Sequence, residues 1–143
     1  MEQIVEAKSI LKKRDILAVL AESVYNPTEE RLMNRADNYI INPNTEVYAN
    51  KENDTYKGII VIDFSNINAI EILDIAVSAS FQKSGIGSSL INHCINMFHP
   101  DEIIAETDDD AVEFYEKFGF HILSLGDKYR AGIKRYQCTF KCK

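Results

Sequence analysis

The interpretation of this chain is decided by one stretch, Ile75-Ala-Val-Ser-Ala-Ser-Phe-Gln-Lys-Ser-Gly-Ile-Gly-Ser-Ser-Leu90. It starts as an apolar strand, passes through a turn with glycines at positions 85 and 87, and continues as an amphipathic helix. Glycine lets the backbone approach a bulky anion, and a helix that begins there directs unpaired N–H groups and a partial positive charge at the same point. The pattern therefore predicts a cradle for the phosphates of a nucleotide-bearing cofactor.

The spacing of the glycines excludes two common phosphate-binding motifs. A Walker loop needs Gly-x-x-x-x-Gly-Lys-Ser/Thr, whereas Lys83 and Ser84 precede both glycines here. The dinucleotide fingerprint requires a third glycine where Ser88-Ser89-Leu90 stands. What remains is a Gln-x-x-Gly-x-Gly pattern from Gln82 to Gly87.

The overall composition is typical of an ordinary cytoplasmic domain. The chain has 143 residues, of which 45% are hydrophobic and 27% charged, so we expect one domain over residues 1–143. No stretch approaches the roughly 18 apolar residues of a membrane span, and the N-terminus is acidic where a signal peptide is basic. The net charge of -6 argues against binding to nucleic acid and slightly favours cationic partners.

The three cysteines predict neither a metal site nor a disulfide framework. Cys94, Cys138 and Cys142 form no Cys-x-x-Cys pair, and their number is odd. We expect buried thiols, because Cys138 and Cys142 share one face of an alternating strand. The acidic run 108–110 lacks the alternating ligands and the glycine of an EF-hand loop, so no metal is expected.

Hydrophobic periodicity predicts helices and strands in a mixed order. Two N-terminal helices are expected, one ending near Val24 and one starting after Thr28 and ending before Pro43. Strands are predicted at Gln3–Ala7, Thr45–Ala49, Tyr56–Phe64, Ala69–Val77, Ile103–Glu106, Phe120–Leu125 and Lys134–Lys141, and two further helices at about 86–98 and 111–118. The first long strands form a meander, and the glycine-led helix then makes a parallel crossover. Cofactors in such sheets bind at the carboxyl ends of strands.

Two motifs in this order resemble those of the GNAT N-acetyltransferase superfamily. The segment Glu71–Gly87 is similar to the family's acetyl-CoA motif, and Asp108-x-x-Ala111-Val-Glu-Phe-Tyr115-Glu-Lys-Phe-Gly-Phe120 resembles its Asn-x-x-Ala-x-x-x-Tyr-x-x-x-Gly-Phe segment. The resemblance implies an α/β (α+β) GNAT fold, with a mixed central sheet of about six or seven strands flanked by about four helices. It also implies direct transfer of an acetyl group from acetyl-CoA to an amine.

The resemblance implies a set of residues that bind coenzyme A. Backbone N–H groups that hold the pyrophosphate carry over to Gln82, Lys83, Ser84, Gly85, Ile86, Gly87 and Ser88. The amides of the pantetheine arm pair with the exposed edge of the preceding strand, at Ile75, Ala76 and Val77. Asp108 stands where the family commonly has asparagine, and its alternative role is to cap a helix.

The chemistry needs a base, an oxyanion donor and an acid. The resemblance assigns the acid to Tyr115, whose alternative is a buried aromatic side chain of the core. It assigns the oxyanion donor to the backbone N–H of Ile75 or Ala76. Glu71 matches the position of the catalytic glutamate in some histone-type members.

The choice of base remains open at this point. Asp74, Glu46 and a chain of water molecules are alternatives to Glu71. Glu71 and Asp74 have opposite parity in a regular strand, so they share a face only if a bulge lies between them. Cys94 is not needed as a nucleophile.

The sequence does not identify the acceptor. We expect a small-molecule or peptide amine. The resemblance implies that it binds to the first two helices, the region 42–57 and the loop 126–134 with Tyr129, Arg130 and Lys134. A homodimer is left open. A competing hypothesis is a regulatory or interaction module that binds coenzyme A without turnover, and transfer of a different acyl group is a third.

Overall fold

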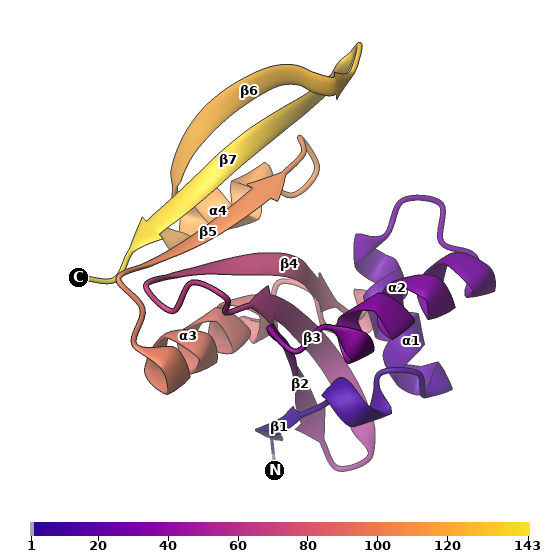
Figure 1. Cartoon of the computed structure of the whole chain (residues 1–143). Coiled ribbons are helices and arrows are strands. Elements are labelled where there is room, and N and C mark those ends of the chain that lie inside the picture. Colours follow the sequence, from indigo (N-terminus) through magenta and orange to yellow (C-terminus); the bar gives the residue numbers. More distant parts are fainter. Residues whose placement is uncertain (1) are drawn as a thin grey trace.

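The strands of the chain form one mixed sheet in the order β1-β2-β3-β4-β5-β7-β6 (Figure 1). The computed structural model describes residues 2–143, apart from the side chains of Tyr129 and Arg130. The strands are β1 (Glu2–Glu6), β2 (Thr45–Glu52), β3 (Thr55–Asp63), β4 (Ala69–Val77), β5 (Glu102–Thr107), β6 (His121–Arg130) and β7 (Ile133–Lys141). The predicted mixed sheet is confirmed.

Four α-helices and three short 3-10 helices connect these strands in the described residues. The α-helices are α1 (Arg14–Leu20), α2 (Glu29–Ile41), α3 (Ile86–Phe98) and α4 (Val112–Phe118), and the 3-10 helices are η1 (Lys8–Ile10), η2 (Ala21–Ser23) and η3 (Ala79–Phe81). The predicted start of α2 is correct, because Thr28 Oγ1 accepts a hydrogen bond from the backbone N–H of Arg31 at 3.1 Å. None of the helices in residues 2–143 is long and apolar enough to span a membrane.

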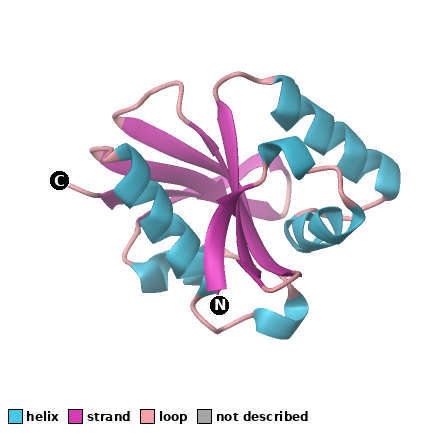
Figure 2. Ribbon diagram, turned by 90° about the horizontal axis from the view of Figure 1, so that it is seen from below, coloured by secondary structure: helices cyan, strands magenta, loops and turns pink. Residues whose placement is uncertain are grey.

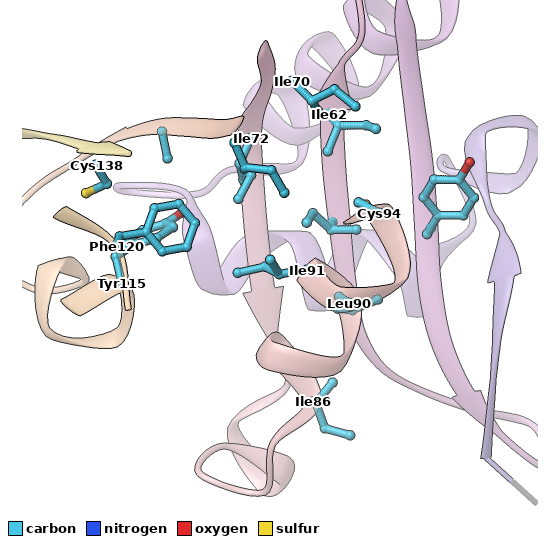
Figure 3. Close-up of a cluster of buried hydrophobic side chains, with 14 residues drawn as sticks. Ile62, Ile70, Ile72, Ile86, Leu90, Ile91, Cys94, Tyr115, Phe120 and Cys138 are labelled. Atoms are coloured by element: carbon cyan, nitrogen blue, oxygen red, sulfur yellow. The ribbon is translucent and has the colours of Figure 1, made fainter. Parts of the chain in front are cut away.

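The helices cover both faces of the sheet (Figure 2), and the sheet separates the core into two layers. On one face α1 packs on β2, β3 and β4 through Ile16, Leu20 and Val61, among others. On the other face α3 and α4 cover a second cluster, whose members include Ile72, Leu90, Ile91, Tyr115 and Phe120 (Figure 3). The sheet therefore separates the side of α1 and α2 from the side of α3 and α4.

The last strand of the chain lies inside the sheet. β7 pairs with β5 on one side and with β6 on the other, both antiparallel. Residues Thr107 of β5 and Tyr136 of β7 are partners, and so are Ser124 of β6 and Tyr136. This arrangement leaves β4 and β5 as the one parallel pair among the described strands, and it lies at the centre of the sheet.

Candidate active site

The parallel strands β4 and β5 separate after four paired residues and form a fork. Residues 69–72 of β4 pair with residues 102–105 of β5, and the pairing ends at Ile72 with Ala105. Beyond this point the two strands diverge (Figure 1). The edge of β4 from Leu73 to Val77 is therefore free of β5, and its backbone groups on that side can bind another extended chain. The predicted pantetheine residues Ile75, Ala76 and Val77 lie on this edge.

A β-bulge in β4 lies directly at the fork. Val61 of β3 is the partner of Asp74 and the next residue, Ile62, is the partner of Ile72, so Leu73 is an extra residue on β4. The extra residue interrupts the regular alternation of side chains between the two faces of the sheet. Asp74 points to the face that α1 and α2 cover, because its partner Val61 belongs to that layer. Glu71 points to the same face, because its neighbours Ile70 and Ile72 point to the other layer.

The predicted phosphate cradle is a turn of unusual backbone conformation that leads into α3. Lys83 has a φ of 65° and Gly85 a φ of 86°, so both residues have a left-handed backbone conformation. Backbone N–H groups around such residues form concave anion-binding nests. Gln82 to Gly85 are exposed, Ile86 and Gly87 are buried, and Ser88 is half-buried. No side chain caps α3 at Gly85, so the N–H groups of its first turn remain available.

The two glycines of the cradle have different physical roles. Gly85 has open space around it, and its left-handed φ is what favours glycine there. At Gly87 a Cβ atom would come within 2.9 Å of the Phe114 ring, so this glycine lets α3 pack closely on α4. Gly58 of β3 lets α3 pack closely on the sheet, since a Cβ at this position would lie 2.6 Å from Ile86 Cγ2. Packing of helix α3 thus accounts for Gly87 without any ligand.

Tyr115 lies in the core beside the fork. Only 4% of the residue is exposed, and its ring makes edge-to-face contacts with Phe114 and Phe120 at centroid distances of 5.3 and 5.1 Å. Figure 3 shows the Tyr115 ring beside Phe120. The Tyr115 hydroxyl has no hydrogen-bond partner among the side chains described in residues 2–143. Burial raises the pKa of the Tyr115 phenol, and the nearby Cys138 and Asp74 raise it further. The hydroxyl therefore keeps its proton at neutral pH.

Glu71 is exposed at the base of the fork. It lies directly opposite Asp63 of β3 and beside Ile104 of β5. Partial burial raises the pKa of the Glu71 carboxyl, and the like charges of Asp63 and Glu106 raise it further. A carboxylate with a raised pKa holds a proton more tightly, which suits a general base.

Asp74 is buried, with 6% of its side chain exposed, and it is bound by three other side chains. Ser23 Oγ donates to Oδ1 at 3.1 Å, and the Tyr39 hydroxyl donates to Oδ2. Arg35 Nη1 donates to Oδ1 at 3.2 Å and to Oδ2 at 2.9 Å. Burial raises the pKa of Tyr39, and the Asp74 charge raises it further. Burial alone lowers the pKa of Arg35, but Asp74 raises it overall.

The Asp108 side chain stabilises the turn before helix α4, whose N-cap residue Ala111 makes no side-chain capping bond. Asp108 Oδ1 accepts hydrogen bonds from the backbone N–H groups of Asp110 at 3.0 Å and Ala111 at 3.2 Å. Asp110 and Glu113 have the spacing of a capping box, but no such box forms, and Glu113 instead pairs with Lys117 at 2.9 Å. The helix predicted at 111–118 matches α4 to within one residue. A contact of Asp108 with a cofactor stays a prediction.

Several other predicted residues lie away from the fork. Glu46 is on β2, which β3 separates from β4, and its Oε1 accepts from the Val47 N–H at 3.0 Å. Cys94 is buried, and burial raises the pKa of its thiol to about 12, so it is a poor nucleophile at neutral pH. Lys134 is exposed on β7. The side chains of Tyr129 and Arg130 lie outside the described residues.

The residues that bind Asp74 were not singled out by the sequence. Arg35 and Tyr39 are four positions apart, so they lie on one face of α2. That spacing is a signal for a shared partner, but it does not identify the partner. Ser23 belongs to η2, and only the tertiary structure brings it to β4.

A known family matches most of this chain. The acetyltransferase (GNAT) domain family matches residues 18–138. The protein therefore belongs to the GNAT acetyltransferase family, as the two sequence motifs predicted.

Three known proteins illustrate the relationship. N-alpha-acetyltransferase 50 from Danio rerio is 28% identical over 76 residues, which are 48% of this chain and 45% of that protein, so the chain matches about half the length of this relative. A GNAT-family acetyltransferase from Desulfovibrio desulfuricans has a TM-score of 0.79 at 19% identity, covering 99% of both chains. An aminoglycoside 6′-N-acetyltransferase complexed with coenzyme A has a TM-score of 0.76 at 17% identity, covering 97% of this chain and 96% of that one. These two structural likenesses show a shared fold.

Proposed function

We propose that the protein transfers the acetyl group of acetyl-CoA to the nitrogen of a primary amine. The observation that carries this proposal is the fork between β4 and β5, which ends directly at an uncapped, left-handed turn into α3. An extended arm with two amides and a pyrophosphate fits such a pair of neighbouring sites. The structure solved with coenzyme A shares this fold and supports the same donor.

The residues of the cradle fit coenzyme A on physical grounds. The pyrophosphate would accept hydrogen bonds from the N–H groups around Ser84 and Gly85 and from the first turn of α3. The turn is exposed from Gln82 to Gly85, so a large anion can reach it. The pantetheine amides would pair with the free edge at Ile75, Ala76 and Val77.

Bound acetyl-CoA would supply a thioester, whose carbonyl carbon is the atom that the amine nitrogen attacks. The backbone N–H of Ile75 or Ala76 stabilises the charge that develops on the carbonyl oxygen. Glu71 would remove a proton from the bound ammonium, directly or through water, so that the neutral amine can attack the carbonyl carbon. Tyr115 donates its proton to the departing sulfur, and its raised pKa keeps that proton in place beforehand.

The test is a screen of primary amines with acetyl-CoA that reads the release of free thiol. The panel contains alkylamines, polyamines, amino acids, aminoglycosides and peptides with free N-termini. We expect at least one class to release thiol well above the rate of hydrolysis without acceptor. Calorimetry with coenzyme A accompanies the screen. Tight binding without turnover on every class would instead support a module that binds coenzyme A and has no acetyltransferase activity.

A further inference from the structure

The donors that bind the Asp74 carboxylate all come from outside the sheet. Ser23 lies on η2, and Arg35 and Tyr39 lie on α2. The bulge at Leu73 points Asp74 toward these elements, one residue before the predicted oxyanion donor at Ile75. A buried carboxylate at this position is placed to contact a molecule that approaches the fork from the side of α2.

The ion pair between Arg35 and Asp74 has an incomplete geometry. Both hydrogen bonds come from a single nitrogen, Nη1, at 3.2 and 2.9 Å. A strong arginine–carboxylate pair uses two nitrogens in parallel. One nitrogen that contacts both oxygens is also the arrangement that an ammonium group would adopt. Arg35 thus contacts Asp74 through one cationic nitrogen, as an amine would.

Helix α2 packs on the core through buried Ala36 and through half-buried side chains such as Leu32 and Ile40, whereas the end of Arg35 lies at the margin of this contact. The Arg35 side chain is 38% exposed, so solvent and ligands reach it. A long, partly exposed side chain can change rotamer without movement of its helix. Arg35 can therefore leave the carboxylate without disrupting the core.

We propose that Asp74 binds the ammonium group of the acceptor and that Arg35 is an internal placeholder which this ammonium displaces. The proposal rests on the proposed acetyltransferase function and names its acceptor class, primary alkylamines that are cationic at neutral pH. When Arg35 Nη1 leaves, Ser23 and Tyr39 still donate to the two oxygens of Asp74. The incoming ammonium then restores the charge balance of the buried carboxylate.

The first test titrates n-butylammonium chloride into the natural protein, without acetyl-CoA, and follows the Nε resonance of Arg35 and the Cζ resonance of Tyr39 by NMR. We expect both resonances to shift along one binding curve at concentrations up to about 100 mM. Butyltrimethylammonium has the same charge and no N–H group, and we expect it to leave both resonances unchanged. If butylammonium moves neither resonance, or if both cations move them equally, the proposal is wrong.

The second test uses variants. Arg35→Gln removes the competing cation, so we expect butylammonium to bind about tenfold more tightly than to the natural protein. Asp74→Asn should abolish the binding. Asp37→Asn is the matched control, because Asp37 is an exposed α2 carboxylate paired with Lys12 at 2.8 Å. The proposal is wrong if Arg35→Gln binds butylammonium with unchanged affinity, or if Asp74→Asn still binds it.

Neither test requires turnover. The titration can therefore succeed even if the amine screen finds no acetyl transfer. That result would refute the acetyltransferase function but not the ammonium site. Conversely, thiol release with amines while butylammonium leaves Asp74 and Arg35 undisturbed would retain the enzyme and refute the placeholder.

Discussion

Tyr115 combines a buried ring with a hydroxyl that lies near the fork. No side chain described in residues 2–143 bonds to this hydroxyl, and the hydroxyl is not one of the fully buried polar atoms without a partner, so it is not sealed inside the core. An acid that acts only when substrate is bound has this property. The same residue can thus belong to the core and to the site.

Replacing Tyr115 with Phe should separate these two roles. The ring stays in place, so we expect little change in unfolding free energy and in the affinity for coenzyme A. Loss of the acid should lower kcat by about a hundredfold or more. Steady-state kinetics and calorimetry measure the two quantities. An unchanged kcat would show that Tyr115 only packs.

Replacing Glu71 with Gln tests the base through pH. Glu71 must be ionised to accept a proton, so kcat of the natural protein should fall as the pH decreases through its raised pKa. Glu71→Gln should lower kcat by about a hundredfold and remove this acidic limb. Because the folded-state pKa is raised, ionised Glu71 does not stabilise the fold at neutral pH. Urea unfolding of the variant should therefore show no loss of stability, whereas a retained acidic limb would point to another base.

At the scale of elements, the fit of α3 against the sheet positions the cradle. Gly58 lies beneath the first turn of α3, near the side chains of Ile86 and Leu90 and the carbonyl of Ala76. The small residue under the helix sets how closely the N–H groups of that turn approach the end of β4. The cradle therefore depends on a residue that contacts no phosphate.

Gly58→Ala should displace α3 from this position. The new Cβ would lie 2.6 Å from Ile86 Cγ2 and 3.1 Å from the Ala76 carbonyl oxygen, so the helix or the strand must shift. We expect a loss of about 1 to 3 kcal/mol in unfolding free energy, which is typical of overpacking. We also expect weaker binding of coenzyme A. Adding Ile86→Leu, which removes the Cγ2 methyl, should restore part of both, and a Gly58→Ala variant as stable as the natural protein would contradict the packing argument.

The sequence predicted those elements whose signals are local. The strand at Ala69–Val77 matches β4 in full, and the helix after Gly85 begins where the glycine turn indicated, because periodicity and turn residues act within a few positions. The bulge at Leu73 was left open, since it depends on the register with β3. The partners of Asp74 and the position of β7 were missed for the same reason, because pairing over long sequence distances leaves no periodic pattern.

At the scale of the whole molecule, the cofactor should join two parts of the sheet that share a short parallel contact. Coenzyme A that spans the fork and the α3 turn would bind only the folded chain. At a hundredfold excess over its Kd, we expect it to raise the unfolding free energy by about 2.7 kcal/mol. Thermal denaturation with and without the ligand measures this effect.

Hydrogen exchange can locate the same effect along the chain. We expect bound coenzyme A to slow exchange most at the N–H groups of residues 75–77 and 84–88, because these would bond to the ligand. Residues 59–62 of β3 are the reference, since they are buried and already paired and should slow only as far as the whole fold is stabilised. If residues 84–88 exchange as fast with the ligand as without it, the ligand binds elsewhere.

The position of β7 also has a consequence for the order in which this protein folds. One edge of β5 pairs with β4, and the other edge pairs with β7, which follows α4 and β6 in the chain and then inserts between β5 and β6. During synthesis the meander and α3 can pair at once, whereas β5 has one edge unsatisfied until β7 has been made. The outer arm of the fork is therefore completed last. Destabilising substitutions in β7 should consequently slow folding and leave the unpaired edge of β5 prone to aggregation for longer, even though none of the β7 residues belongs to the cradle.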